Sequence, residues 1–456
     1  MIARELRSVL DAGAVLDPVP SAYLSDATEG RGLRGHADAV VLPRTAAEVA
    51  AVVAWCCAHD VAMVPRGGGT GFAAGAVPLD GGVVISLERL TAIRAFDPQL
   101  WRIHVEAGVL TADVRRRARE NGLLFPPDPG AAESSQIGAN IATNAGGPHS
   151  FKYGVTGAWV TGLEVVVTPG DVIAVGGPVR KDVAGYDIKS LMIGSEGTLG
   201  IVTAAWLRLI PAPQAALPVV ALYRDTATGC TAIERVLAVG LQPSALEYLD
   251  RASVTAAAAG SPLDLPAGTG FMVIAEADGS ATEAARVRDG LAESLGDGAL
   301  AVHLPETRRD VEALWRWRDG VSLAVTAQLG GKVSEDIVVG LDRLAEAIEA
   351  TLEIGARHDL RACSWGHAGD GNLHSTFMVA ADDEAGLERA AAAAEELFAL
   401  AVHCGGSVSG EHGVGWVKRH ALARQWAPRA LDLHSEIKRA FDPQGLMNPG
   451  KKPARG

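Results

Sequence analysis

Three histidines and one glutamate stand in two short glycine-rich segments near the C-terminal end of the chain. The segment WGHAGDGNLHST contains His367 and His374, and the segment GGSVSGEHGVG contains Glu411 and His412. Two imidazoles and one carboxylate make an open ligand set for a divalent metal, which can polarise a substrate hydroxyl. His412 then remains to accept the hydroxyl proton as a general base. The alternative is that all four are ordinary polar residues of turns, but glycine-rich surroundings favour the close approach of a ligand.

Three further glycine-rich stretches lie in the N-terminal half, within residues 64–201. They read VPRGGGTGFAAGA, IGANIATNAGG and GYDIKSLMIGSEGTLGI, and we expect all three to be loops. Glycine permits positive φ and removes the side chain, so backbone N–H groups can approach an anion closely. One such stretch alone would favour a surface turn, whereas three of them favour loops that wrap a large, flat, polar-edged cofactor.

The first stretch also contains a rival motif, because Gly69 to Ala74 matches the G-x-G-x-x-A fingerprint of dinucleotide-binding folds. That fingerprint requires a helix that begins on its glycines. Gly75, Pro78 and the glycine pair after Asp80 follow too soon for such a helix. We therefore expect no Rossmann site, and the sequence has no Walker pattern either.

Taken together, the motifs PRGGGTG, PPDPG with IGANIATNAGG, and GSEGTLGI resemble the FAD-binding domain of the vanillyl-alcohol oxidase and p-cresol methylhydroxylase superfamily. The resemblance implies that the first loop binds the FAD pyrophosphate and that the others follow the flavin, the ribityl chain and the remaining FAD edge. The first loop contains neither His nor Cys, so we expect FAD to be bound non-covalently. The cofactor-binding residues that the resemblance implies are Arg66, Gly67, Gly68, Gly69, Thr70, Gly71, Pro127, Gly130, Ser135, Gly138, Asn140, Ile141, Asn144, Glu196, Gly197 and Ile201.

The segments GHAGDGNLH and SGEHGVG, with the closing FDPQGLMNPGK, are similar to signatures of FAD-linked D-2-hydroxy acid dehydrogenases. That family includes D-lactate dehydrogenase, D-2-hydroxyglutarate dehydrogenase and the flavin subunit of glycolate oxidase. The similarity implies that His367, His374 and Glu411 bind zinc or manganese and that His412 is the general base.

The segment WRWRDGVSLAVTAQLGGKVSEDI resembles the part of this family that holds the substrate carboxylate. The resemblance implies Arg318 and Lys332 as the cations, with Ser322 beside them. A guanidinium suits this role because it can bind a carboxylate through two hydrogen bonds. The spacing is looser here, so Arg316 is an alternative register and a solvated charged helix face is the alternative structure.

These resemblances imply an enzyme that oxidises a small D-2-hydroxy acid to the 2-keto acid, with the hydride passing to flavin N5 and the proton to His412. Ser375 and Thr376 stand where dicarboxylate-using relatives tend to carry an amide side chain, which favours D-lactate or glycolate. The alternatives are a D-2-hydroxyglutarate dehydrogenase, a metal-independent flavin alcohol oxidase, or a flavin subunit that only relays electrons in a larger complex. The electron acceptor would be a quinone, an electron-transfer flavoprotein or another carrier.

The pattern of apolar residues and turn residues predicts a two-domain α+β protein. We expect an FAD-binding domain over residues 1–212, a cap over residues 213–430, and a tail over residues 431–456 that returns to the FAD domain. The cap should hold the metal site and an antiparallel sheet with helices. Expected helices cover residues 46–58, 110–121, 230–240, 281–295, 339–358 and 384–403, and expected strands lie within residues 61–65, 80–90, 101–107, 160–175, 218–224 and 271–277.

The composition limits the partners and the compartment. The 456 residues are 48% hydrophobic and carry a formal net charge of −13, so the chain repels phosphate backbones and we expect no nucleic-acid partner. Its five cysteines show no C-x-x-C spacing, which argues against disulfides and thiolate zinc sites. The start lacks the apolar core of a signal peptide, and no apolar run reaches the ~18 residues of a membrane span. We expect a cytoplasmic protein, peripheral membrane contact being an open alternative, and a homodimer by family analogy.

Overall fold

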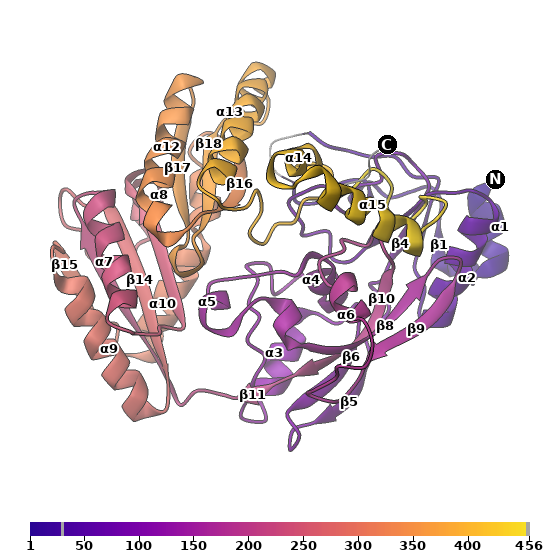
Figure 1. Ribbon diagram of the computed structural model, residues 1–456, viewed down its shortest axis with the longest axis horizontal. Helices are drawn as coiled ribbons and strands as arrows, with labels where there is room; N and C mark the ends of the chain where they lie inside the picture. The colour runs from indigo at the N-terminus through magenta and orange to yellow at the C-terminus, as the bar shows by residue number, and fades with distance from the viewer. Residues whose placement is uncertain (29–31, 453–456) are drawn as a thin grey trace.

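The computed structural model describes residues 1–28 and 32–452, and Figure 1 shows two domains that lie side by side. The first half of the chain forms the N-terminal domain, and the main sheet of the second domain begins at Ala215. Helices and mainly antiparallel sheets in two domains confirm the α+β class expected from the sequence.

The first sheet of the N-terminal domain is four-stranded and leads into the first glycine-rich stretch. Its order is β1 (Val15–Leu16), β2 (Ala39–Val41), β4 (Val83–Ser86) and β3 (Met63–Arg66), with β2, β4 and β3 parallel. Helices α1 (Ile2–Val9) and α2 (Ala46–Ala58) share one buried cluster with these strands. Residues 67–73 therefore leave the sheet at the carboxyl ends of its parallel strands, a usual position for a ligand site.

The second sheet is five-stranded and antiparallel. Its order is β5 (Ile93–Asp97), β6 (Arg102–Glu106), β10 (Ile201–Arg208), β8 (Val160–Val167) and β9 (Asp171–Gly176). The connecting helices are α3 (Thr111–Arg119), α4 (Ile137–Thr143), α5 (Ser150–Tyr153) and α6 (Ile188–Met192), and the short strands β7 (Leu123–Leu124) and β11 (Ile210–Pro211) pair with each other. Ile137 and Ile141 of α4 belong to the core of this sheet, so α4 is fixed to it.

The second domain, called the cap below, is built on a seven-stranded antiparallel sheet. Its order is β15 (Ala301–His303), β12 (Ala215–Tyr223), β14 (Phe271–Gly279), β13 (Ala245–Asp250), β17 (Arg361–His367), β18 (Asn372–Met378) and β16 (Lys332–Val338). Successive residues of β12 belong to different buried clusters, so both faces of the sheet are covered. Helices α7 (Thr226–Ala238), α9 (Ala281–Gly296), α12 (Leu344–Arg357) and α13 (Glu384–His403) cover one face, and α8 (Arg251–Ala257), α10 (Arg308–Asp319) and α11 (Val321–Thr326) cover the other.

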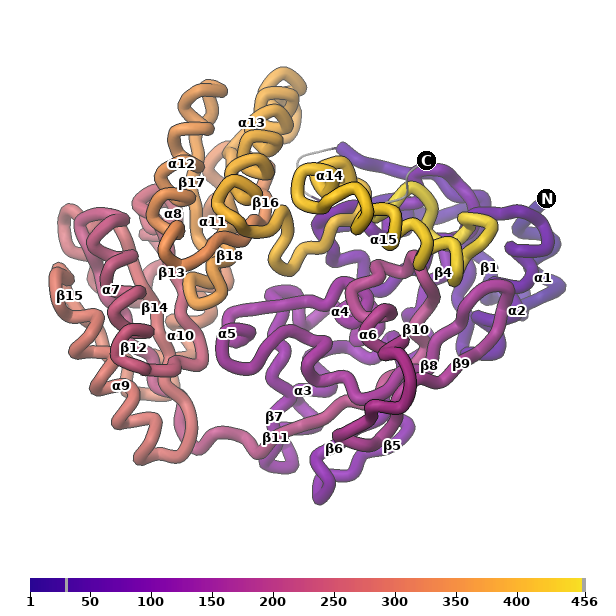
Figure 2. Tube along the Cα trace, in the orientation of Figure 1, coloured from indigo at the N-terminus to yellow at the C-terminus, as the bar shows by residue number. Residues whose placement is uncertain are grey.

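The end of the chain runs back over the N-terminal domain, as the yellow segment in Figure 2 shows. Helix α14 (Leu422–Gln425) precedes α15 (Pro428–Phe441), whose Phe441 packs on the core of the five-stranded sheet. Beyond α15, the N–H of Asn448 donates to the carbonyl of Met63 at 2.7 Å. The tail therefore contacts the strand from which the first glycine-rich stretch leaves.

Three details differ from the expectations. Residues 137–147 were expected to be a loop, but Ile137–Thr143 form α4, because Ile137 and Ile141 lie one helical turn apart and both face the core. The stretch 185–201, also expected as a loop, contains the short helix α6. The helix expected over 339–358 begins only at Leu344, since β16 extends to Val338 and a 3-10 turn intervenes.

Two kinds of helix that the sequence argued against can be looked for in the described residues: one that begins on the first glycine-rich stretch, and one that could span a membrane. No helix begins on the glycines between Gly69 and Gly82, all of which are described, so the helix that the Rossmann fingerprint requires does not follow them. Within residues 1–28 and 32–452, no helix is long and apolar enough to cross a membrane.

Candidate active site

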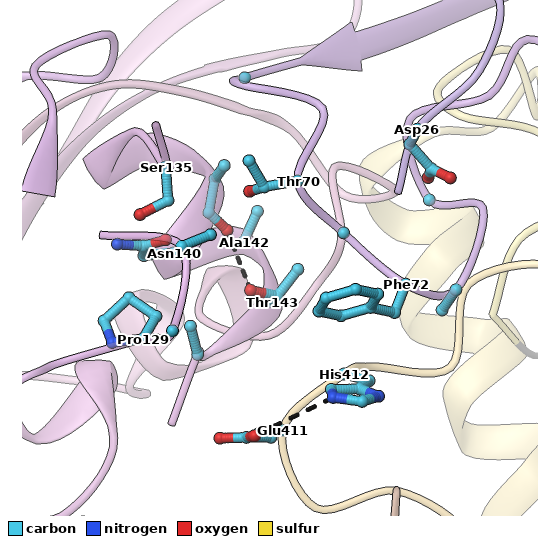
Figure 3. Close-up of a pocket in the computed structure, with 18 of the residues that line it drawn as sticks. Asp26, Thr70, Phe72, Pro129, Ser135, Asn140, Ala142, Thr143, Glu411 and His412 are labelled. Atoms are coloured by element: carbon cyan, nitrogen blue, oxygen red, sulfur yellow. Dashed lines mark hydrogen bonds and ion pairs between the residues drawn. The ribbon is translucent and has the colours of Figure 1, made fainter. Parts of the chain in front are cut away.

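A cavity of about 440 Å³ lies between the glycine-rich stretches of the N-terminal domain and the cap. Figure 3 shows Thr70, Ser135 and Asn140 on one side of it, and Phe72 facing His412 on the other. The expected site residues that line the cavity are Arg66, Gly67, Gly69, Thr70, Gly71, Gly130, Ser135, Asn140, Glu196, Gly197, Ile201, Arg318, Ser322, Lys332, His367, His374, Glu411 and His412. The structure therefore brings the imidazoles of the C-terminal half to the cavity that the glycine-rich stretches surround.

Five expected cofactor residues do not line the cavity: Gly68, Pro127, Gly138, Ile141 and Asn144. A Cβ on Gly68 would lie 2.3 Å from the carbonyl oxygen of residue 134, and a Cβ on Gly138 would lie 2.6 Å from the Cβ of residue 107. Ile141 is fully buried, Pro127 is buried, and Asn144 has a left-handed backbone and accepts a hydrogen bond from the N–H of residue 157. These residues shape the wall of the cavity, and the sequence motif did not separate wall residues from lining residues.

The first glycine-rich stretch offers backbone donors to the cavity. Among the described residues, the N–H groups from Gly68 to Ala73 donate no hydrogen bond, whereas the next one, of Ala74, donates to Thr28 at 2.7 Å. Unpaired backbone N–H groups around a cavity fit an anionic group such as a pyrophosphate. The arrangement therefore fits the cofactor that the motif implies.

Arg66 has a different environment from the one its place in the motif suggests. Its guanidinium donates to the carbonyl oxygens of Ala22 and Ser25, both at 2.8 Å, and more weakly to Ala76. Burial lowers the pKa of Arg66, while the nearby Asp26 opposes that shift. Arg66 thus holds the N-terminal segment over the glycine-rich stretch, and its guanidinium also lines the cavity.

The register of the cap sheet gathers the polar residues of the site on one face. His374 lies opposite Trp365 on one side and opposite Asp336 on the other, and His367 lies opposite Glu247. Directly opposed residues of antiparallel strands, and residues two apart on one strand, point to the same face. Alternation along β13, β17, β18 and β16 therefore places all of these side chains toward the cavity side of the sheet.

His367, His374 and Glu411 form a compact cluster. The Oε1 atom of Glu411 lies 3.4 Å from Nε2 of His367 and 3.5 Å from Nε2 of His374, and one ligand atom from each of the three lies within 4.8 Å of the others. On its far side, His367 donates from Nδ1 to Oε1 of Glu247 at 2.7 Å. A carboxylate behind a ligating imidazole is the usual support of a metal-binding histidine. The donor set and its support therefore fit a divalent cation.

Burial and neighbouring charges set the protonation of this cluster. Burial alone would lower the pKa of His367, but Glu247 and Glu411 raise it to about 10. Burial also opposes ionisation of Glu411, yet the imidazoles around it bring its pKa down to about 2. Burial keeps the pKa of His374 well below its usual range. An ionised carboxylate beside a neutral imidazole suits a bound cation, which would take the place of the proton on His367.

His412 is held next to the cluster by contacts from both domains. Its Nδ1 lies 3.5 Å from Oδ1 of Asp336, and its ring stacks on His374 at a centroid distance of 5.2 Å. Phe72 of the first glycine-rich stretch covers it at a centroid distance of 4.6 Å (Figure 3). His412 therefore faces the cavity, and a buried carboxylate lies at ion-pair distance from its imidazole.

Arg318, Ser322 and Lys332 also lie at the cavity, on the side of α10 and α11. Arg318 is 8% exposed and pairs with the second oxygen of Glu247, while its Nε has no hydrogen-bond partner among the described residues. The ammonium of Lys332 donates to the carbonyl and the hydroxyl of Ser322. Because Arg318 is buried at the cavity, the alternative of a solvated charged helix face is wrong for it, and the exposed Arg316 does not line the cavity. An unpartnered guanidinium N–H fits a substrate carboxylate.

Three residues that matter to this geometry were not singled out in the sequence: Glu247, Asp336 and Phe72. Glu247 and Asp336 lie on strands whose alternate residues face the site, so correct assignment of β13 and β16 would have indicated them. Phe72 stands among the glycines of the first stretch, where an aromatic residue offered no signal by itself.

A glycine-rich N-terminal domain, an imidazole-bearing cap and a cavity of about 440 Å³ between them fit a flavin-linked oxidoreductase. The chain belongs to the FAD-linked oxidases: residues 212–452 match the family described as FAD linked oxidases, C-terminal domain, and residues 37–176 match the FAD binding domain. The sequence resemblance to this family is thereby confirmed.

Relatives of known name are similar over nearly the whole chain. The chain is 36% identical to "Glycolate oxidase subunit GlcD" of Bacillus subtilis (strain 168), over 91% of this chain and 88% of that protein. It is 35% identical to "D-lactate dehydrogenase" of Anaerostipes hadrus, over 89% and 87%, and 32% identical to "D-2-hydroxyglutarate dehydrogenase" of Stutzerimonas stutzeri (strain A1501), over 98% and 97%. Substrate-bound p-cresol methylhydroxylase has a TM-score of 0.81 at 17% identity, covering 98% of this chain and 95% of that chain, which shows the shared fold.

Proposed function

We propose that this protein is an FAD- and metal-dependent dehydrogenase that oxidises a small D-2-hydroxy acid to the 2-keto acid. One observation carries the proposal: His367, His374 and Glu411 form a metal-competent cluster in the cavity that the FAD motifs line, with His412 and Arg318 beside it. The names of the relatives, which concern glycolate, D-lactate and D-2-hydroxyglutarate, support the substrate class.

Each side chain has a chemical part in this proposal. Arg318 binds the substrate carboxylate and so fixes the Cα–H in the cavity. His412 accepts the hydroxyl proton, and the carboxylate of Asp336, 3.5 Å from its Nδ1, stabilises the resulting positive charge. When bound, a Zn²⁺ or Mn²⁺ ion on the cluster would lower the pKa of the substrate hydroxyl, and non-covalent FAD would supply the hydride acceptor. Phe72 and Trp365 contribute aromatic rings to the lining of this region.

A small monocarboxylate, D-lactate or glycolate, is the favoured substrate. Thr376, which stands where dicarboxylate-using relatives tend to carry an amide, donates or accepts a hydrogen bond with Ser334 at 2.8 Å, and Ser334 lines the cavity. Ser375 instead pairs with Thr351 inside the cap. Neither side chain offers the amide group that would suit a second carboxylate.

This proposal assigns a role to each part of the chain. Residues 1–212 would bind FAD, and residues 213–430 would bind metal and substrate. The tail, residues 431–456, would return to the FAD domain. Electrons would then leave to a quinone, an electron-transfer flavoprotein or another carrier in the cytoplasm.

Anaerobic bleaching of the flavin tests the proposal. We expect D-lactate or glycolate to bleach the flavin, L-lactate to fail, and D-2-hydroxyglutarate to react more slowly. Prior treatment with a chelator should abolish bleaching, and added Zn²⁺ or Mn²⁺ should restore it. Chelator-insensitive bleaching by simple alcohols would instead favour a metal-independent oxidase, and no bleaching by any 2-hydroxy acid would favour an electron-relay subunit.

A further inference from the structure

The segment that carries Glu411 and His412 is irregular and is held almost entirely by two carboxylates. We call residues 409–415 the Glu411 loop. Asp336 of the cap accepts hydrogen bonds from the N–H groups of residues 410, 411 and 412 at 2.7, 2.7 and 2.9 Å. Glu196 of the N-terminal domain accepts the N–H groups of residues 414 and 415 at 2.9 and 2.6 Å, one on each carboxylate oxygen. Five of six consecutive N–H groups are thus held, from two domains.

Glu196 is itself firmly placed. It is 8% exposed, and its own N–H donates to the carbonyl of Ala142 at 2.7 Å. Its carbonyl accepts a hydrogen bond from the Asn448 side chain at 2.8 Å, and Lys452 lies 3.4 Å from its carboxylate. The backbone N–H and the backbone carbonyl of Glu196 are thus both hydrogen-bonded, which fixes the position of its carboxylate. Such a carboxylate can hold a loop in one position, because each charge-assisted hydrogen bond is stronger than a neutral one.

The loop is also joined to the first glycine-rich stretch. The N–H of Trp416 donates to the carbonyl of Ala73 at 2.9 Å, directly after Phe72, whose ring covers His412. Glu411 and His412 are therefore held by Asp336 of the cap, while the residues that follow them are held by the N-terminal domain.

We propose that Glu196 is a positioning residue through which the FAD-binding domain sets the position of the Glu411 loop and so completes the metal site. Although Glu196 lines the cavity, both of its carboxylate oxygens are engaged by the loop. The carboxylate therefore acts on the metal cluster through Val414 and Gly415. This inference rests on the proposed function, since it concerns the metal cluster of that site.

The test is the Zn²⁺ affinity of FAD-loaded Glu196→Gln, measured by competition with a chromophoric chelator. A glutamine can accept only one of the two N–H groups, so the loop loses one anchor and the charge. We expect the Zn²⁺ dissociation constant to rise about 10- to 100-fold, the range typical for lost support of a ligand. If this variant does not fold, Glu196→Asp keeps the charge but is one methylene too short to reach both groups, and the same rise is expected.

The matched control is Asp442→Asn. Asp442 is 2% exposed and, like Glu196, accepts one backbone N–H on each oxygen, from Leu446 and Met447, but it holds the tail and does not line the cavity. The Zn²⁺ dissociation constant of the Asp442→Asn variant should stay within about threefold of the wild-type value.

Amide hydrogen exchange at single-residue resolution gives an independent reading. In Glu196→Gln, exchange should accelerate at residues 414 and 415 and stay slow at residues 410–412, which Asp336 still holds. Unchanged Zn²⁺ affinity and exchange in a folded variant would overturn the inference, as would loss of FAD with Zn²⁺ affinity intact. Wild-type protein that binds no Zn²⁺ would overturn the metal site of the proposed function together with the inference, whereas a wild-type site that behaves as expected isolates the role of Glu196.

Discussion

Replacement of Glu247 by glutamine should lower the affinity for the metal and leave the FAD-to-protein ratio unchanged. Glu247 is fully buried between Arg318 and His367, and both neighbours lower its pKa against the effect of burial. Glutamine keeps the shape but removes the charge that orients His367 through its Nδ1–H. Loss of such support typically costs about 10- to 100-fold in metal affinity, which corresponds to about 1.4–2.7 kcal/mol. Leaving Arg318 buried without its partner should also destabilise the metal-free protein by about 3–5 kcal/mol.

The assay is the Mn²⁺ or Zn²⁺ dissociation constant of Glu247→Gln, measured by isothermal titration with the FAD-to-protein ratio recorded in parallel. Asp250→Asn is the control, because Asp250 lies on the same strand, is 1% exposed, and accepts the N–H groups of Ser253 and Ser364 away from the cavity. Its metal affinity should remain near the wild-type value. A Glu247→Gln protein that binds metal as tightly as wild type would refute the assignment of His367 as a supported ligand.

Three further predictions concern the base, the carboxylate anchor and the glycine wall. His412→Ala should lower turnover by about 10²-fold or more with flavin retained, and near-normal turnover would remove His412 as the base. Arg318→Lys lacks the unpartnered Nε, so KM for the 2-hydroxy acid should rise about 10-fold or more, and an unchanged KM would place the carboxylate elsewhere. Gly68→Ala should reduce the FAD-to-protein ratio, because its Cβ would meet a backbone oxygen at 2.3 Å, whereas Gly13→Ala has open space and should not; equal ratios in the two variants would contradict the packing argument.

The sequence predicted the fold well where periodicity was strong. Helix α2 begins and ends where expected, at Ala46 and Ala58. Helix α13 also does so, at Glu384 and His403. The failures have physical causes. Helix α4 was missed because its glycine and asparagine are weak helix formers, and packing of Ile137 and Ile141 in the core outweighs that preference.

Some residues of the site can be predicted from motifs of a few residues, whereas others depend on contacts between distant parts of the sequence. Glycine, histidine and glutamate motifs identify the cavity because their chemistry is local to a few residues. Glu247 and Asp336 could not be found in this way, since their roles depend on strand register between segments far apart in the sequence. Glu196 was expected at the FAD edge, yet its carboxylate holds a loop more than 200 positions along the chain, which no local motif reveals.

We propose above all that one cavity holds both the flavin and the metal cluster. Anomalous X-ray diffraction from crystals of the FAD-loaded protein soaked with Zn²⁺ measures this directly. We expect an anomalous peak within about 2.0–2.2 Å of the ligand atoms of His367, His374 and Glu411, with the flavin ring in the same cavity. A peak at other residues, or a flavin ring outside the cavity lined by these three, would contradict it.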